Sequence, residues 1–168
     1  MKAKSPIKPS KLYWDDLNEG QNYVYGEYLV TEYELTQFAY KYDPLDFHID
    51  AHKSKNTPFG TLIASGIHTL AINQRLSVNH VYKNWHLIAG KSMSNCRFIR
   101  PVHPNDVLTV NLTIKKLIKS NRPDRGVVEL KFIVINQINL PVLKVDGEVL
   151  LLRKPPSSIQ LKQDKDTI

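Results

Sequence analysis

The strongest restriction on the fold is a two-residue alternation in the second half of the chain. Along residues 107–114 the aliphatic side chains occupy every second position, as Leu108, Val110, Leu112 and Ile114. Successive side chains of a strand point to opposite faces, so this period predicts a strand with one buried face. Two more strands are predicted over 127–138 and 142–152, with a turn at Asn139-Leu140-Pro141 between them. Strands joined so closely should pair antiparallel.

The region before these strands predicts a further strand and a helix. Residues 21–30 are rich in tyrosine and valine, which favour strands. Thr31 and, three residues later, Glu34 match a capping box, in which each side chain accepts a hydrogen bond from the other residue's N–H. Pro44 disfavours the helical conformation in the residue before it, so this helix should end near Tyr42 and continue into a loop.

A second and longer helical pattern runs from Leu62 to about Val81. Its apolar residues available for a buried face are Ile63, Ile67, Leu70, Ala71 and Val78. One long helix that precedes a run of long strands indicates an α+β domain, whose antiparallel sheet wraps or backs the helix.

Length and charge indicate one domain with two polar tails. The 168 residues suit a single domain, and the net charge of +7 is concentrated near the ends. Residues 1–11 carry +4 and residues 154–168 carry +1, which leaves +2 for residues 12–153. We therefore expect a domain over 12–153, between a basic N-terminal tail and a polar C-terminal tail.

Several classes of protein are disfavoured. The body has no zinc-finger spacing, no ribonucleoprotein aromatic motif and no long basic helix, so we expect no nucleic-acid partner. No apolar run approaches the roughly 18 residues that cross a bilayer. The first residues lead into no apolar signal core, and the lone Cys96 cannot form an internal disulfide. These features predict a cytoplasmic protein without a membrane partner.

Residues 42–50 place three aspartates and a histidine around a proline. Asp43 and His48 are close enough in sequence to face one site. A carboxylate beside an imidazole can orient it and share acid and base duties on a water molecule. The alternative is a loop aspartate that caps the next helix and a histidine on the surface, and the residues alone leave both interpretations open.

A metal site in the same segment is disfavoured. His48 and His52 flank Asp50, but alternate residues share one side only in an extended strand, and this segment borders turns. Asp50 instead precedes a short helical pattern over 51–55, which it would cap.

Gly66 stands near the start of the long helical pattern. Free N–H groups at a helix start can bind an oxygen that becomes negative during a reaction, and a glycine permits close approach. A glycine required only for packing is the alternative. Ser65 lies in no Gly-x-Ser-x-Gly elbow, so we expect it to cap the helix rather than act as a nucleophile.

Four segments in order resemble the MaoC-like dehydratases, a hot-dog-fold family that includes the R-specific enoyl-CoA hydratases. The segments are W-D-D-L-N-E-G (14–20), Y-D-P-L-D-F-H (42–48), P-F-G-T-L-I-A-S-G (58–66) and R-F-I-R-P-V-H-P-N-D (97–106). The resemblance covers about residues 12–153. Asp43 and His48 keep the spacing of the family's Asp-x-Asn-Pro-x-His, with Leu45-Asp46 in place of Asn-Pro. The family's Ala-His-Gly is here Ala64-Ser65-Gly66.

This resemblance implies a hydratase or dehydratase that acts on an enoyl-CoA or a related acyl thioester. Asp43 and His48 would activate a water, and the N–H of Gly66 would hold the thioester carbonyl oxygen. Residues implied to contact the substrate are Ser65, Phe59, Lys91, Arg97 and Arg100. The reaction requires no metal or redox cofactor, and coenzyme A enters only as part of the substrate. Hot-dog domains generally pair, so a homodimer with a tunnel between its subunits is expected.

Two other functions remain open for the same pocket. A hot-dog thioesterase would direct water at the carbonyl carbon rather than at the double bond. A non-catalytic acyl-CoA-binding protein would keep the pocket but not the reaction, with Leu45 and Ser65 as marks of a degraded site.

Overall fold

The computed structural model describes residues 11–156, so most of both predicted tails lies outside the described residues. The strands are β1 (Asn22–Leu29), β2 (Leu87–Phe98), β3 (Val107–Lys119), β4 (Arg125–Ile135) and β5 (Pro141–Leu152). The α-helices are α1 (Glu32–Tyr42), α2 (Asp46–Ile49) and α3 (Gly66–His80), and short 3-10 turns cover Trp14–Asp16, Lys53–Asn56 and Tyr82–Asn84. None of the helices in this part of the chain is long and apolar enough to cross a membrane.

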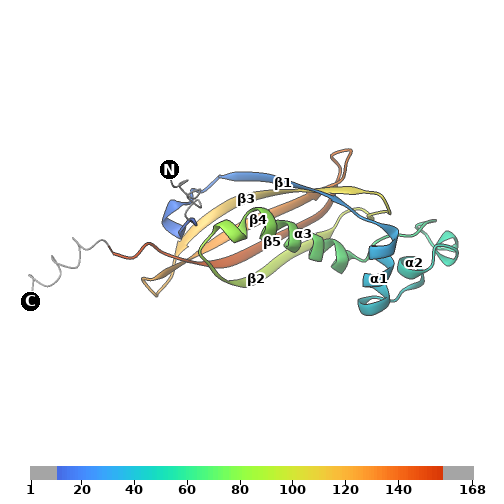
Figure 1. Cartoon of the computed structure of the whole chain (residues 1–168), viewed down its shortest axis with the longest axis horizontal. Helices are drawn as coiled ribbons and strands as arrows, with labels where there is room; N and C mark the ends of the chain where they lie inside the picture. Colours follow the sequence, from blue (N-terminus) through green and yellow to red (C-terminus); the bar gives the residue numbers. More distant parts are fainter. Residues whose placement is uncertain (1–10, 157–168) are drawn as a thin grey trace, which may run out of the picture.

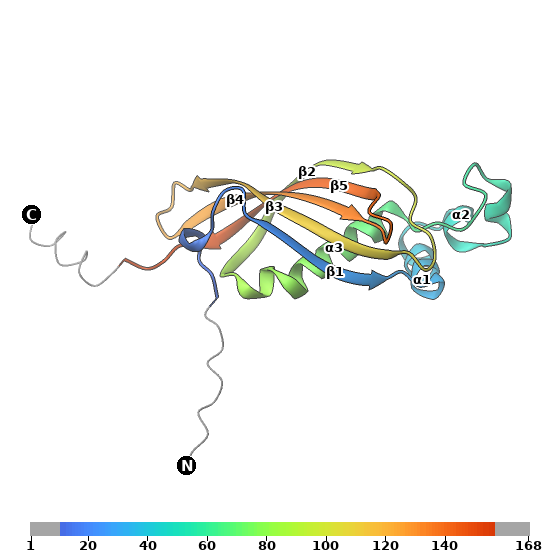
Figure 2. The same ribbon diagram turned by 90° about the horizontal axis from the view of Figure 1, so that it is seen from above.

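The five strands form one antiparallel sheet in the order β1-β3-β4-β5-β2. Its centre is the series β3, β4 and β5, whose short connections predicted antiparallel pairing. The helix α3 lies along one face of the sheet, and α1 and α2 gather beyond one end of it (Figure 1). Figure 2 shows the same arrangement from above, with β1 and β2 at the two edges. The expected α+β arrangement of a long helix against an antiparallel sheet is confirmed.

The alternation predicted for β3 agrees with the observed burial of its side chains. Leu108, Val110, Leu112 and Ile114 are all at most 1% exposed and belong to the core. The paired strand β4 adds a second row of core residues, which consists of Val128, Leu130, Phe132 and Val134. Each strand therefore turns one face toward α3, because side chains of a strand alternate between the two faces of the sheet.

The prediction for the long helix was wrong in two respects. The helix α3 begins at Gly66 rather than Leu62, because residues 62–64 are extended and buried, and the N–H of Ala64 donates to the carbonyl of Val102 (2.8 Å). The predicted buried face is also wrong in part, since Ile67, Ala71 and Val78 are exposed. The buried residues of α3 are instead His68, Thr69, Ile72, Asn73, Leu76 and Ser77.

The helix α1 carries half of the predicted capping box. The hydroxyl of Thr31 accepts the N–H of Glu34 at 3.2 Å, as expected. The carboxylate of Glu34 does not return to the helix start. It accepts a hydrogen bond from the hydroxyl of Tyr28 and lies 3.5 Å from Nε2 of His68. Long-range partners therefore replace the local bond, and they join α1 to β1 and α3.

His68 is the buried member of this contact. Its side chain is 3% exposed, and its Nδ1 has no hydrogen-bond partner. Its ring stacks on the ring of Phe38, with 4.6 Å between the two ring centroids. Burial lowers the pKa of His68, and the nearby Glu34 carboxylate opposes this shift only in part. Burial also raises the pKa of Tyr28 to about 12, so its hydroxyl stays protonated and donates to Glu34. Two cations line the same pocket as His68 and Glu34, namely Lys41 and Arg75, and the guanidinium of Arg75 lies over the Tyr28 ring.

The stability of the fold should therefore depend on pH through His68. Because its pKa is lower in the folded chain, the unfolded chain takes up the proton first as the pH falls. We expect the free energy of unfolding to decrease between about pH 7.5 and about pH 5.5, around the ordinary histidine value. Urea unfolding across this range should show a smaller pH slope for His68→Gln. The exposed His52 provides the control, and a His52→Gln slope that fell as much as that of His68→Gln would contradict the assignment.

Candidate active site

The end of α1 and the start of α2 bring the predicted pair together. Asp43 follows α1 as its C-terminal cap, and its N–H donates to the carbonyl of Ala39 (2.8 Å). His48 lies in the one-turn helix α2, where sequence analysis predicted only a loop. The short connection between α1 and α2 thus brings the Asp43 carboxylate to 3.5 Å from the imidazole of His48.

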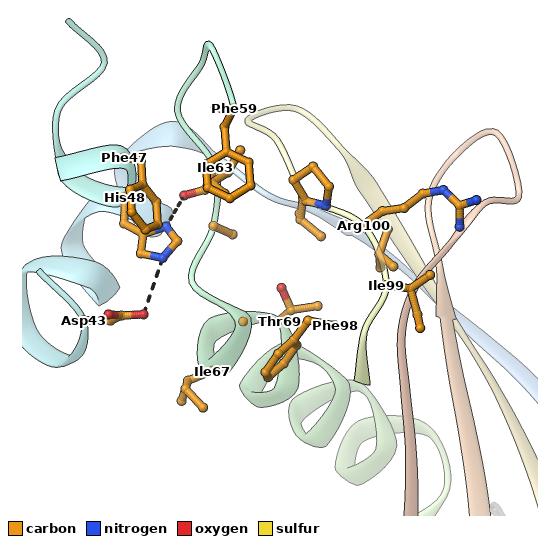
Figure 3. Close-up of a pocket in the computed structure, with 15 residues that line it drawn as sticks. Asp43, Phe47, His48, Phe59, Ile63, Ile67, Thr69, Phe98, Ile99 and Arg100 are labelled. Atoms are coloured by element: carbon orange, nitrogen blue, oxygen red, sulfur yellow. Dashed lines mark hydrogen bonds and ion pairs between the residues drawn. The ribbon is translucent and has the colours of Figure 1, made fainter. Parts of the chain in front are cut away.

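A backbone carbonyl fixes the orientation of His48. The imidazole is buried, and its Nδ1 lies 2.8 Å from the carbonyl oxygen of Ile63 (Figure 3). A carbonyl only accepts hydrogen bonds, so Nδ1 carries the proton. The other nitrogen, Nε2, faces Oδ2 of Asp43 at 3.5 Å. In the neutral form of the imidazole, Nε2 is then the unprotonated nitrogen, and it lies beside a carboxylate oxygen.

Two acceptors that face each other can share a molecule with two donors. A water fits this requirement, because it can donate one hydrogen to Nε2 of His48 and the other to the Asp43 carboxylate. The oxygen lone pairs of that water would then point away from both groups. The side chain of Asp43 is 30% exposed and that of His48 is 7% exposed, so solvent reaches the pair from the carboxylate side.

Ser65 links the carboxylate to the start of α3. Its hydroxyl donates to Oδ2 of Asp43 at 2.7 Å and accepts the N–H of Ile67 at 3.2 Å. It is the N-terminal cap of α3, as predicted, and it is fully buried. The structure therefore places Ser65 behind Asp43, where it holds the carboxylate in position.

The pair opens into a cavity of about 480 Å³ at the N-terminal end of α3. Its lining combines Asp43 and His48 with aromatic and aliphatic side chains, among them Phe47, Phe59, Ile63, Phe98 and Ile99. Figure 3 shows Thr69 and Phe98 beside the first turn of α3, facing the same space. Such an apolar lining lowers the local dielectric and strengthens electrostatic interactions within the cavity.

Gly66 is the first residue of α3 and also lines the cavity. The N–H groups of the first turn have no acceptor within a helix, so this amide can bind a ligand oxygen. A side chain here would also collide with its surroundings, since an added Cβ would lie 2.8 Å from the ring of Phe98. The packing interpretation of this glycine is therefore supported, and its place in the cavity lining is compatible with the catalytic one.

The predicted substrate contacts separate into two groups. Phe59 and Arg100 line the cavity, and the guanidinium of Arg100 donates to the carbonyl of Pro141 (2.9 Å). Ser65, which lies behind Asp43, does not line this cavity, and neither do Lys91 and Arg97, which lie on β2. Lys91 pairs with Glu148 at 2.8 Å on the neighbouring strand β5. One chain thus brings Phe59 and Arg100 into the same cavity lining as Asp43 and His48.

Asp50 has a structural role, but the helix that it was predicted to cap over 51–55 is a 3-10 turn over Lys53–Asn56 with His52 as its N-cap. Its carboxylate accepts the N–H groups of His52 and Lys53 at 2.8 and 3.0 Å, and these bonds lower its pKa. Within residues 11–156, no group of three or more histidine, cysteine, aspartate or glutamate side chains could hold a metal ion. Sequence analysis missed the carbonyl of Ile63, since a backbone acceptor leaves no trace in residue type.

Comparison with known proteins identifies the family of the chain and agrees with its fold. The family described as MaoC like domain matches residues 18–137. The uncharacterized protein YdeM of Bacillus subtilis (strain 168) is 31% identical over 141 residues, which cover 83% of this chain and 97% of that protein.

Two solved structures extend the comparison. The MaoC-like dehydratase from Rhodospirillum rubrum has a TM-score of 0.79 at 30% identity, covering 86% of this chain and 99% of that one. The R-hydratase PhaJ1 from Pseudomonas aeruginosa has a TM-score of 0.71 at 25% identity, covering 88% and 96%. The structural similarity confirms the expected hot-dog fold.

Replacement of Ser65 should weaken the fold at the site. Ser65→Ala removes the cap of α3 and the hydrogen bond to Asp43. We expect the free energy of unfolding to fall by about 0.5–2 kcal/mol, the usual cost of a lost helix cap. Urea unfolding measures this change, with the exposed Ser94→Ala as the matched control. Equal midpoints for Ser65→Ala and the wild type would refute the structural role.

Proposed function

The chain belongs to the MaoC-like domain family, and from this premise we propose that it is a hydratase or dehydratase of an enoyl thioester. It would add water across the double bond of an enoyl-CoA, or remove it in the reverse direction. The proposal rests on one observation: the Asp43–His48 acceptor pair and the free amide of Gly66 line the same cavity. The similarity to an R-hydratase, at 25% identity, supports the same reaction class.

The proposed reaction begins with the thioester carbonyl oxygen on the N–H of Gly66. The water shared by Asp43 and His48 attacks C3 of the enoyl group, and its proton passes to the pair. The electrons of the C2–C3 double bond move onto the carbonyl oxygen, where the Gly66 amide stabilises the negative charge. A proton then returns to C2 and completes the addition. Dehydration follows the same steps in reverse.

Each group in this scheme is preorganised. The carbonyl of Ile63 keeps the proton of His48 on Nδ1, so Nε2 is ready to accept one. The hydroxyl of Ser65 holds the Asp43 carboxylate. Preorganised groups lower the barrier because they need little rearrangement when charge develops. The replacement of the family's histidine by Ser65 therefore leaves the proposed machinery intact.

We further propose that two copies of the chain form the complete substrate tunnel. The strand β2 is an edge of the sheet and is exposed from Ile88 to Phe98. The outer face of α3 adds the exposed Ile67 and Val78. A second copy paired along β2 would extend the sheet and cover these apolar side chains. Lys91 and Arg97, which lie on β2, could then contact the coenzyme A of a neighbouring site.

Loss of the acid–base pair should abolish hydration without loss of the fold. We expect Asp43→Asn and His48→Gln each to lower kcat by about 10² to 10⁴, the usual contribution of general acid–base catalysis. The assay follows the decrease of enoyl absorbance with a panel of short, medium and branched enoyl-CoA substrates. Asp46→Asn is the matched control, because Asp46 lies near the pair in sequence but bonds only the exposed Lys53.

The same assay separates the other functions. A wild-type protein that binds saturated acyl-CoA but turns over none of the panel would favour the non-catalytic binding protein. Release of free coenzyme A thiol without loss of the double bond would favour the thioesterase. Unchanged kcat in both variants would remove Asp43 and His48 from the reaction.

The proposed pairing of two copies along β2 forms a seam between the subunits. A charged residue placed in this seam should change the oligomeric state. Met93 is 55% exposed on β2, and Met93→Lys places a charge where the partner would pack. We expect the wild type to sediment as a dimer and Met93→Lys to sediment as a monomer. Val24→Lys is the control, since Val24 is 70% exposed on β1, at the opposite edge of the sheet. A monomeric wild type, or dissociation by Val24→Lys instead, would contradict the seam.

A further inference from the structure

The buried face of α3 carries two polar side chains whose hydrogen bonding is incomplete, His68, which lies beside Glu34, and Asn73. Asn73 is 1% exposed, and its Oδ1 has no hydrogen-bond partner. Buried polar groups are nearly always paired, because an unpaired one loses its bonds to water without replacement. An unpaired amide at the centre of a core helix therefore requires a physical reason.

The polar residues around Asn73 do not share this property. The hydroxyl of Ser77 donates to the carbonyl of Asn73 at 2.8 Å and lies 2.9 Å from the hydroxyl of Tyr25. The hydroxyl of Thr69 reaches the carbonyl of Ser65 at 3.4 Å. The hydroxyls of Ser77 and Thr69, each one turn from Asn73, thus have hydrogen-bond partners within the chain. The amide oxygen of Asn73 has none.

Asn73 borders a cavity of about 290 Å³ between α3 and the strands β2, β4 and β5. Its apolar wall is formed by Leu87, Met93, Phe132 and Val149. Gly90 and Gly147 also line it, and a Cβ added at Gly90 would meet no atom within 4 Å. The χ2 torsion of an asparagine is soft, so the amide can turn toward this space without a change in the backbone.

This second cavity follows the catalytic cavity along the same helix. Thr69 lines the catalytic cavity and Asn73 lines the second, four residues and one turn later on the same face. Asn73 lies seven residues after Gly66, which corresponds to about 10 Å along the helix axis. A thioester whose carbonyl rests on Gly66 could thus extend an arm along α3 as far as Asn73.

We propose that the cavity at Asn73 binds a neutral hydrogen-bonding group of the thioester, a hydroxyl or an amide. This inference rests on the proposed function for the position of the thioester. An amide side chain offers one acceptor and one donor group, and a hydroxyl or an amide in the ligand can match both. A plain alkyl chain would leave the asparagine unpaired, and the site would then select against it.

The charges around the cavity argue against an anionic ligand group. Among the described residues that line it, Lys91 is the one cation, and its ammonium already pairs with Glu148 at 2.8 Å. Ser92 donates to the same carboxylate at 3.0 Å. A ligand carboxylate only accepts hydrogen bonds, so it would leave Oδ1 of Asn73 unpaired and would meet the Glu148 charge.

The neutral group could belong to either arm of the thioester. One source is a hydroxyl on the acyl chain, and the other is an amide of the pantetheine arm of coenzyme A. The experiment compares kcat/KM for two enoyl-CoA substrates of equal chain length, one with a hydroxyl at its distal end and one without. The proteins compared are the wild type, Asn73→Leu and the control Asn79→Leu, an exposed asparagine of the same helix.

For an acyl hydroxyl, the wild type should prefer the hydroxylated substrate by about tenfold, and Asn73→Leu should lose that preference while it keeps its rate on the plain one. For a pantetheine amide, Asn73→Leu should raise KM for both substrates by about tenfold with kcat unchanged. In both cases the thermal midpoint of Asn73→Leu should equal or exceed that of the wild type, because an unpaired buried amide has been removed.

Equal kinetics of Asn73→Leu and the wild type on both substrates, with no preference in either, would overturn the proposal and leave the hydratase function standing. A lower thermal midpoint with uniform loss of activity, or a changed sedimentation state, would assign Asn73 a structural role and also overturn it. If the wild type turns over no enoyl-CoA, the hydratase proposal fails separately. Calorimetric titration of the matching saturated acyl-CoA pair then gives the same comparison without turnover.

Discussion

The site depends on a short extended segment, residues 62–65, that passes between α2 and α3. The N–H of Ile63 donates to the carbonyl of Phe47 at 3.1 Å, and its own carbonyl accepts Nδ1 of His48 at 2.8 Å. Ser65 then bonds Asp43 and caps α3. Ile63 and Ser65 thus fix the tautomer of His48, the position of the Asp43 carboxylate and the start of α3. Had α3 begun at residue 62, as its pattern predicted, the carbonyl of Ile63 would have accepted a hydrogen bond within the helix instead of the one from His48.

This arrangement explains why a serine can stand where the family has a histidine. A serine hydroxyl donates and accepts at once, so Ser65 can bond the Asp43 carboxylate and still receive the N–H of Ile67. Serine is also a favoured helix cap, so the local and the long-range requirement agree. The fully buried position leaves no room for a larger side chain without a shift of α1 or α3.

The sequence predicted those parts of the fold in which the buried positions are occupied by apolar residues and the exposed positions by polar ones. The alternation in β3 predicted its core face, and the spacing of Asp43 and His48 predicted a shared site. The buried face of α3 was not predictable in this way, because periodicity assumes that aliphatic residues point inward. Ile67 points outward and Asn73 inward. Glu34 likewise left its local capping partner for Tyr28 and His68, since tertiary contacts override local patterns.

Two exceptions to the usual polarity of a helix connect the two proposals, and both lie on α3. A helix in an isolated domain is stabilised by apolar side chains that face its core and polar ones that face water. In α3 the inner face holds an unpaired amide at Asn73, and the outer face exposes Ile67 and Val78. Each feature lowers the stability of the single chain, and each is relieved by a different contact. A polar ligand group would satisfy the inner face and a second subunit would cover the outer one, so the same helix favours the occupied, assembled state over the isolated chain.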